Sequence, residues 1–341
     1  MSVSKAPSLL VLRALGLGDF LTGVPAYRAI ADAFPTHRRT FAAPAALHAL
    51  VPLLGAVFSD VCDAAPLGAL PARSRGVDVA IDLHGRGPQS HRALLALGPQ
   101  RLLAFANDAA DLPAGGAAWI DGEHEVHRWC RMLRYYNIAA DPSGLQLAVP
   151  SVAVPAGLRQ ATIVHPGAAS EARRWPIERW AAVARACVER GERVVVTGAP
   201  DETSLTSEIA RRANLDPAND VAGRTSLIEL AALIAAAERV LCGDTGVAHL
   251  ASAYAVPSVL LFGPTSPAEW GPPQRPFHRV IWAGDSGDPH APTIDRGLLA
   301  IEPIDVLNEI ERLRSLRHTH VREEGRSKTK SAAVTSSSVP L

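Results

Sequence analysis

The chain has 341 residues, 48% of them hydrophobic, and its 34 Lys plus Arg balance 34 Asp plus Glu. This length favours two domains of ordinary size. The balanced charge argues against nucleic-acid binding, which needs a clustered basic face.

The cysteines and the start of the chain indicate a cytoplasmic protein. None of the four cysteines forms a Cys-x-x-Cys pair, which favours buried thiols in a reducing compartment over a disulfide framework. Residues 1–7 do not resemble a signal peptide, and the apolar run 9–12 is far shorter than the ~20 residues of a membrane span. We expect no transmembrane segment. Peripheral contact with the inner face of the cytoplasmic membrane is compatible with this expectation.

In residues 1–140, short apolar runs alternate with stretches of helical period. Strands are predicted at 9–12, 40–43, 57–62, 77–83 and 102–105, and helices at 20–34, 45–54, 90–97 and 125–136. Strands that alternate with helices imply a parallel sheet with right-handed crossovers. We therefore expect a Rossmann-like N-terminal domain over 1–140.

The composition and the hydrophobic pattern of the sequence change after residue 140. Proline and glycine recur between residues 141 and 158 and no hydrophobic period survives there. Frequent proline and glycine are typical of a loop. We interpret 141–158 as the linker between two domains.

The second half again alternates predicted strands with predicted helices. Strands are predicted at 161–165, 193–197, 240–242 and 258–262, and helices at 177–190, 201–213, 226–237 and 245–254. Gly191 lies just beyond the first of these helices, where a glycine commonly ends a helix. The pattern predicts a second Rossmann-like domain over 159–300, so the fold class is α/β with two facing domains.

The last segment divides into two parts. Residues 301–316 keep an amphipathic period and are predicted to form a C-terminal helix. Residues 317–341 contain few apolar side chains, so we expect a disordered tail.

In open α/β sheets, ligands bind beyond the carboxyl ends of the strands. The first such loop carries Gly16 and Gly18 and leads to Asp19 at the start of a helix. An aspartate there commonly caps the helix. Asp19 could also serve as a general base facing the cleft, since a carboxylate can accept the proton of an attacking hydroxyl.

The second loop follows the strand that ends at His165 and presents Arg173 and Arg174 before a helix. Arginine side chains bind phosphate oxygens in a bidentate fashion. The simpler interpretation is a pair of solvated surface charges.

The third loop, residues 243–249, opens a helix with Asp244, Thr245 and Gly246. Free N–H groups at a helix start attract anions such as a diphosphate. His249 lies one turn later on the same face, although a single helical histidine is usually ordinary packing.

The fourth loop carries Gly263 and Thr265 after a buried strand. Its Gly-Pro pair is also what a simple turn would show.

Several common site patterns are absent from the sequence. It contains no Walker A motif, no Gly-x-Ser-x-Gly elbow, no zinc-ligand spacing and no Asp-x-Asp segment of the kind that holds a metal-bound nucleotide sugar. We therefore expect no metal, with the charge of a diphosphate met by arginine and helix amides.

Taken together, the four loops resemble glycosyltransferase family nine, the lipopolysaccharide heptosyltransferases and their relatives. The resemblance spans residue 10 to about residue 272. Its motifs are Leu12-Arg13, Gly18-Asp19, Pro25, residues 82–85, His165-Pro166-Gly167, residues 173–176, residues 197–202, residues 222–227, and the run from Gly243 through His249 to Thr265.

This resemblance implies a GT-B fold, with an acceptor-binding N-terminal domain and a C-terminal domain that binds a nucleotide sugar. It also implies that the C-terminal helix packs back across the cleft between the domains. It implies an inverting, metal-independent transfer of a sugar, heptose in the best-known case, from an ADP-sugar to a glycan or glycolipid. Asp19 becomes the expected base. The expected donor contacts are Arg173, Arg174, Asp244, Thr245, Gly246, His249, Gly263 and Thr265.

The acceptor side is predicted less sharply. Gly18, His84, Arg86 and Arg92 are expected to face the acceptor, where the arginines would hold phosphate or carboxylate groups. The chain departs from the family at Arg173, because relatives often carry lysine there. Two alternatives stay open: a GT-B nucleotide-sugar epimerase, and a catalytically silent protein that binds sugar nucleotides.

Overall fold

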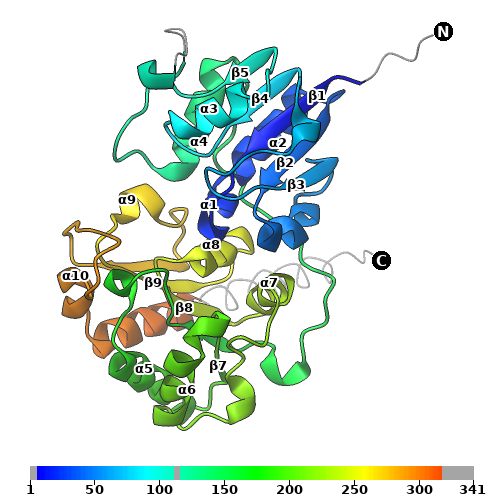
Figure 1. The fold of residues 1–341 in the computed structure, drawn as a ribbon. Coiled ribbons are helices and arrows are strands. Elements are labelled where there is room, and N and C mark those ends of the chain that lie inside the picture. Colours follow the sequence, from blue (N-terminus) through cyan, green and yellow to red (C-terminus); the bar gives the residue numbers. More distant parts are fainter. Residues whose placement is uncertain (1–5, 111–115, 317–341) are drawn as a thin grey trace, which may run out of the picture.

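The computed structural model describes residues 6–110 and 116–316. They form two five-stranded sheets in which every strand pair is parallel, one in each half of the chain (Figure 1). The α/β prediction is confirmed. The predicted disordered tail, 317–341, lies outside the described residues, and the exact division into domains and linker stays a prediction.

The first sheet has the strand order β3-β2-β1-β4-β5. Its strands are β1 (Ser8–Leu12), β2 (Arg38–Ala43), β3 (Asp60–Asp63), β4 (Val79–Asp82) and β5 (Arg101–Leu103). Its helices are α1 (Leu17–Thr22), α2 (Val24–Ala33), α3 (Gln89–Leu95) and α4 (Glu125–Tyr135), and η1 (Ala45–Leu54) is a 3₁₀ segment. The carboxyl ends of β1 and β4 are adjacent, so the loops after them share one edge of the sheet.

The second sheet has the order β10-β9-β8-β6-β7. Its strands are β6 (Thr162–His165), β7 (Val194–Val196), β8 (Arg239–Gly243), β9 (Ser258–Phe262) and β10 (His278–Trp282). Its helices are α5 (Ile177–Glu189), α6 (Thr203–Arg212), α7 (Leu227–Ala235), α8 (Gly246–Ala253), α9 (Pro267–Trp270) and α10 (Arg296–Ala300). The sequence analysis had not predicted β10, which adds an edge strand.

The helix predicted at 20–34 is two helices with a break at Gly23. A Cβ at Gly23 would lie 2.3 Å from the hydroxyl of Tyr27, so only glycine fits at this close approach. Pro25 then lies in the first turn of α2, where a proline ring costs a helix least. The break therefore separates the short α1 from α2.

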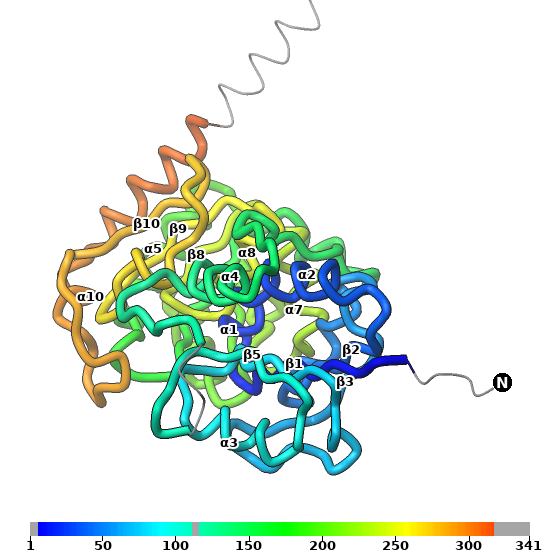
Figure 2. Tube along the Cα trace, turned by 90° about the horizontal axis from the view of Figure 1, so that it is seen from above, coloured from blue at the N-terminus to red at the C-terminus, as the bar shows by residue number. Residues whose placement is uncertain are grey.

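A continuous apolar core joins the two halves. It includes Phe20 and Phe41 from the first half and Leu250 and Leu260 from the second. α1 packs against α8, and both views place these helices side by side between the sheets (Figure 1, Figure 2). The halves therefore meet through buried apolar surface as well as through the loops that surround the cleft.

Residues 303–316 form the expected C-terminal helix. Its buried side chains Val306, Ile310 and Leu313 belong to the core on the outer face of the second sheet, with Trp180 of α5. The expectation that this helix packs back across the cleft was wrong, because its apolar side chains pack against the second half of the chain.

Candidate active site

A cavity of about 660 Å³ lies between the two halves, at the carboxyl ends of their central strands. Gly16, Leu17, Gly18 and Asp19 line it from the first half. The second half contributes Ala169, Arg173, Asp244, Thr245, Gly246, His249, Pro264, Thr265, Glu269, Trp270, Ser286, Gly287, Pro289 and His290. The structure therefore brings together most of the side chains predicted for base and donor site.

Two glycines allow α1 and α8 to approach closely at the floor of this cavity. A Cβ at Gly18 would lie 3.2 Å from His249 Cδ2, and a Cβ at Gly246 would lie 2.8 Å from the side chain of Leu17. Side chains at either position would push the helices apart. The helix starts thus face each other across the cavity, one from each half.

Asp19 lies in the first turn of α1, whose N-cap is Gly16. The interpretation of Asp19 as the helix cap was therefore wrong. Its side chain is 27% exposed and opens onto the cavity. Partial burial raises the pKa of the Asp19 carboxyl, opposed by the nearby charge of Arg13 and reinforced by Glu125. A raised pKa suits a group that must take up a proton near neutral pH.

Behind Asp19, Arg13 is completely buried. Its Nε donates to the backbone oxygen of Asp19 at 2.5 Å, and its two Nη atoms donate to Leu83 O, Thr22 Oγ1 and Glu125 Oε1. The Nη2 atom also lies 3.6 Å from Asp19 Oδ1. One guanidinium therefore ties β1, α1, the end of β4 and α4 together and fixes the turn that carries Asp19.

Glu125 balances this buried charge. Its carboxylate accepts from Arg13, from Trp129 Nε1 at 2.7 Å and from Arg128. These cations lower the pKa of Glu125 against the effect of burial, so the carboxylate stays ionised. Arg13 also stacks over the Trp129 ring, 4.7 Å from its centroid. We refer to Arg13, Asp19, Thr22, Glu125 and Trp129 as the Arg13 cluster.

Across the cavity, α8 begins at Thr245. The Thr245 hydroxyl accepts from the N–H of Val247 at 3.4 Å, and Thr245 and Gly246 at the start of the helix line the cavity. Arg173 Nη1 donates to the Asp244 backbone oxygen at 3.3 Å and lies 3.8 Å from its carboxylate. Burial raises the pKa of Asp244, while Arg173 and the Thr265 hydroxyl oppose that rise. This end of the cavity is suited to bind an anion.

His249 is held as a neutral imidazole. Burial lowers its pKa to about 4, with smaller effects from His124, Glu125 and Arg13. A neutral ring beside Gly18 and Trp270 can donate one hydrogen bond to a ligand but supplies no charge.

Two predicted donor residues do not line the cavity. Arg174 Nε donates to Ala168 O at 3.1 Å, and its Nη atoms face Glu171 and Glu202 at 3.5 and 3.9 Å. Gly263 lies under α10, where a Cβ would meet Leu298 at 3.2 Å. Both residues support the loops around the cavity.

The predicted acceptor residues other than Gly18 also lie outside the cavity. The N–H of Ala14 donates to His84 Nδ1 at 3.2 Å, and burial lowers the pKa of His84 to about 4. Arg86 is exposed, with its backbone oxygen bonded to Asn107, and Arg92 donates to the backbone oxygen of Ala109. Their role toward an acceptor stays a prediction.

Several lining residues were not predicted. Glu269 and Trp270 belong to α9, and Ser286, Gly287, Pro289 and His290 belong to the loop between β10 and α10. This loop had no period or motif in the sequence, and the strand before it was also missed. Arg13 and Glu125 support Asp19 without lining the cavity. The position of Arg13, directly after a buried strand, could have indicated a role at the site. Its partner Glu125 lies 112 residues away in the sequence, so no local pattern links the two.

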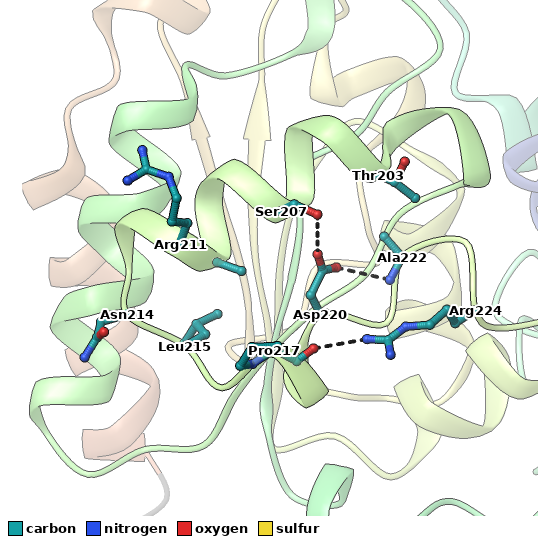
Figure 3. A pocket seen from close by; sticks show the side chains of 10 residues that line it. Thr203, Ser207, Arg211, Asn214, Leu215, Pro217, Asp220, Ala222 and Arg224 are labelled. Atoms are coloured by element: carbon teal, nitrogen blue, oxygen red, sulfur yellow. Dashed lines mark hydrogen bonds between the residues drawn. The ribbon is translucent and has the colours of Figure 1, made fainter.

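A second cavity, of about 550 Å³, lies between α6 and residues 217–224 (Figure 3). Its polar groups already bond one another: Ser207 donates to Asp220, the N–H of Ala222 donates to Asp220, and Arg224 donates to Pro217 O.

Within residues 6–110 and 116–316, no group of three or more His, Cys, Asp or Glu is arranged to hold a metal ion. In the same ranges, no helix is long and apolar enough to cross a membrane.

The family model of glycosyltransferase family 9 (heptosyltransferase) matches residues 121–291, half of the chain. The chain belongs to glycosyltransferase family 9. The match covers the donor-side loops at 169–173, 244–249 and 264–270 together with α4, which carries Glu125.

This family 9 protein is 31% identical to lipopolysaccharide heptosyltransferase 2 of Escherichia coli K12 over 154 residues, 42% of this chain and 43% of that protein. The alignment thus spans less than half of that relative.

Two solved structures share the fold over nearly the whole described chain. The E. coli ADP-heptose lipopolysaccharide heptosyltransferase II is 21% identical, with a TM-score of 0.71 over 91% of this chain and 99% of that one. A family 9 glycosyltransferase from Veillonella parvula is 19% identical, with a TM-score of 0.76 over 90% and 97%. The GT-B expectation for the fold is confirmed.

Proposed function

We propose that this family 9 protein is an inverting glycosyltransferase that moves a sugar from a nucleoside diphosphate donor to an acceptor hydroxyl. The observation that carries the proposal is the position of Asp19. A carboxyl of raised pKa from the first half faces, across one cavity, an arginine and a helix start from the second half. A base and a diphosphate site on opposite walls are what direct displacement at an anomeric carbon requires.

In this mechanism the donor diphosphate lies against the first N–H groups of α8 and the Arg173 side chain. Thr245, Thr265 and the neutral His249 donate further hydrogen bonds, and Asp244 orients Arg173. Arginine and helix amides at this position support a reaction that needs no divalent cation.

The acceptor enters from the side of Gly18 and Asp19. The Asp19 carboxylate takes the proton of the acceptor hydroxyl as its oxygen bonds to the anomeric carbon. The bond from that carbon to the diphosphate breaks, and its electron pair stays on the leaving phosphate, where Arg173 meets the new charge. Attack from the face opposite the leaving group inverts the anomeric centre.

We further propose an ADP-sugar donor, heptose by likeness to the named relatives, and a glycan or glycolipid acceptor of lipopolysaccharide synthesis reached from the cytoplasm at the inner membrane surface. The likeness to heptosyltransferases supports this choice. Arg174 and Gly263 are left out of the proposed donor site because their contacts are structural.

The test is thermal unfolding with ADP, UDP, GDP and their sugars, with and without a chelator. A ligand that binds only the folded state at 100 times its Kd adds about 2.7 kcal/mol of stability. We expect ADP ligands to stabilise equally with and without the chelator. Stabilisation by UDP or GDP ligands alone would contradict the ADP-sugar assignment, and no stabilisation by any nucleotide would contradict the transferase.

A further inference from the structure

Carboxyl groups outnumber arginines among the residues that line the cavity. Asp19, Asp244 and Glu269 bring three carboxyl groups to the lining residues, against the one arginine, Arg173. That arginine is already paired with Asp244 at 3.8 Å. Arg174 points away toward Glu171 and Glu202. A leaving diphosphate gains negative charge, so the proposed donor site needs another cation or proton donor.

Two histidines also line this cavity, and they differ in their surroundings. His249 is buried, which lowers its pKa to about 4. His290 is exposed, and within the described part of the chain its ring has no hydrogen-bond partner. The His290 ring is therefore free to donate a hydrogen bond to an incoming phosphate.

The loop of His290 is fixed in place on both sides. Ser170 Oγ donates to Pro289 O, and the N–H of Ala172 donates to Ala291 O at 3.3 Å. The N–H of Gly287 donates to Pro264 O at 2.9 Å. The His290 N–H donates to Asp288 Oδ1 at 2.8 Å. These bonds anchor His290 to the two loops that carry Arg173 and Thr265.

We propose that His290 is a second ligand of the donor diphosphate, to which its ring donates a hydrogen bond. This inference rests on the proposed function and names a further donor-binding residue within the same site.

The experiment is calorimetric titration of the full chain with ADP. His290→Ala should weaken ADP binding roughly 10- to 100-fold, the range for a hydrogen bond to a charged group. His290→Lys, which keeps a hydrogen-bond donor at this position, should retain most of the affinity.

His127→Ala is the matched control, since His127 is exposed on α4 and does not line the cavity. It should bind ADP like the wild type. If wild type binds ADP but His290→Ala binds it equally well, the role of His290 is overturned and the proposed function is not. If wild type binds no nucleoside diphosphate, the proposed function fails and this inference fails with it.

Discussion

Arg13 holds Asp19 from behind: its Nε donates to the Asp19 backbone oxygen at 2.5 Å, and its Nη2 lies 3.6 Å from the Asp19 carboxylate. Because the guanidinium is fully buried and also bonds Glu125, the position and the pKa of Asp19 depend on residues that never reach the cavity. The Arg13 cluster thus links the fold of the first half to the proposed chemistry.

We predict that Glu125→Gln moves the acidic limb of the kcat/KM profile to lower pH. The negative charge of Glu125 raises the pKa of Asp19, so its removal lowers that pKa. A general base works when deprotonated, so the loss of activity on acidification then starts at a lower pH. Profiles of wild type and variant measure this shift. Glu123→Gln, which removes a partner of Arg131 outside the cluster, should leave the limb in place.

Arg13→Gln should move the same limb in the opposite direction, to higher pH, because Arg13 lowers the pKa of Asp19. It should also lower the free energy of unfolding by about 3–5 kcal/mol, the usual cost of leaving one member of a buried pair unpaired. Shifts of equal sign in the two variants would rule out electrostatic control of Asp19 by the cluster.

We predict that Gly246→Ala lowers turnover and stability together. Its Cβ would meet Leu17 at 2.8 Å, so α8 and α1 must separate. Overpacking of this kind costs about 1–3 kcal/mol, and separation of the helices widens the gap between base and donor site. Denaturant unfolding and transfer kinetics measure both effects. At Gly157 a Cβ would enter open space, so Gly157→Ala should change neither; a silent Gly246→Ala would show that the close approach is not needed.

Buried Asp82 gives a prediction on stability and pH. Burial raises its pKa to about 6, opposed by bonds from Ser90 and from the backbone at His84 and Gly85. The folded pKa lies above the ordinary value of about 3.9. The stability contributed by this carboxyl is therefore complete below pH ~4 and is lost as the pH rises through 6.

Asp82→Asn removes that loss. Relative to wild type, the variant should gain up to roughly 3 kcal/mol in free energy of unfolding between pH ~4 and ~8, measured by urea unfolding at each pH. Asp78→Asn is a control of opposite sign, since bonds from Ser8 lower the pKa of Asp78. A flat difference between Asp82→Asn and wild type would show that Asp82 ionises in the fold as freely as in the unfolded chain.

The sequence predicted those parts of the fold that local patterns determine. Strands β1 and β9 are short apolar runs that each follow a proline, and Gly191 ends α5 with a φ of +78° as expected. Strand β10 was missed because it is an edge strand in which only His278 is buried and which contains no long apolar run. The break at Gly23 depends on the ring of Tyr27, which no propensity describes.

The candidate site likewise contains residues that local sequence patterns predicted and residues that only the tertiary structure places there. Asp19, Thr245 and His249 follow buried strands or open helices, and the structure places all three on one cavity. Arg174 was indistinguishable from Arg173 in the sequence, because the difference arises from Glu202, a buried carboxylate on another loop. His290 and Glu125 reach the site through tertiary packing alone, so no local motif marked them.

The most direct test of the central claim is Asp19→Asn, assayed for donor binding and for sugar transfer on the same preparation. We predict that Asp19→Asn binds ADP with an affinity within a few-fold of wild type. Its rate of sugar transfer should fall by a factor of roughly 10²–10⁴, the usual contribution of a general base. Transfer at the wild-type rate by a folded Asp19→Asn variant would contradict the assignment of Asp19 as the base.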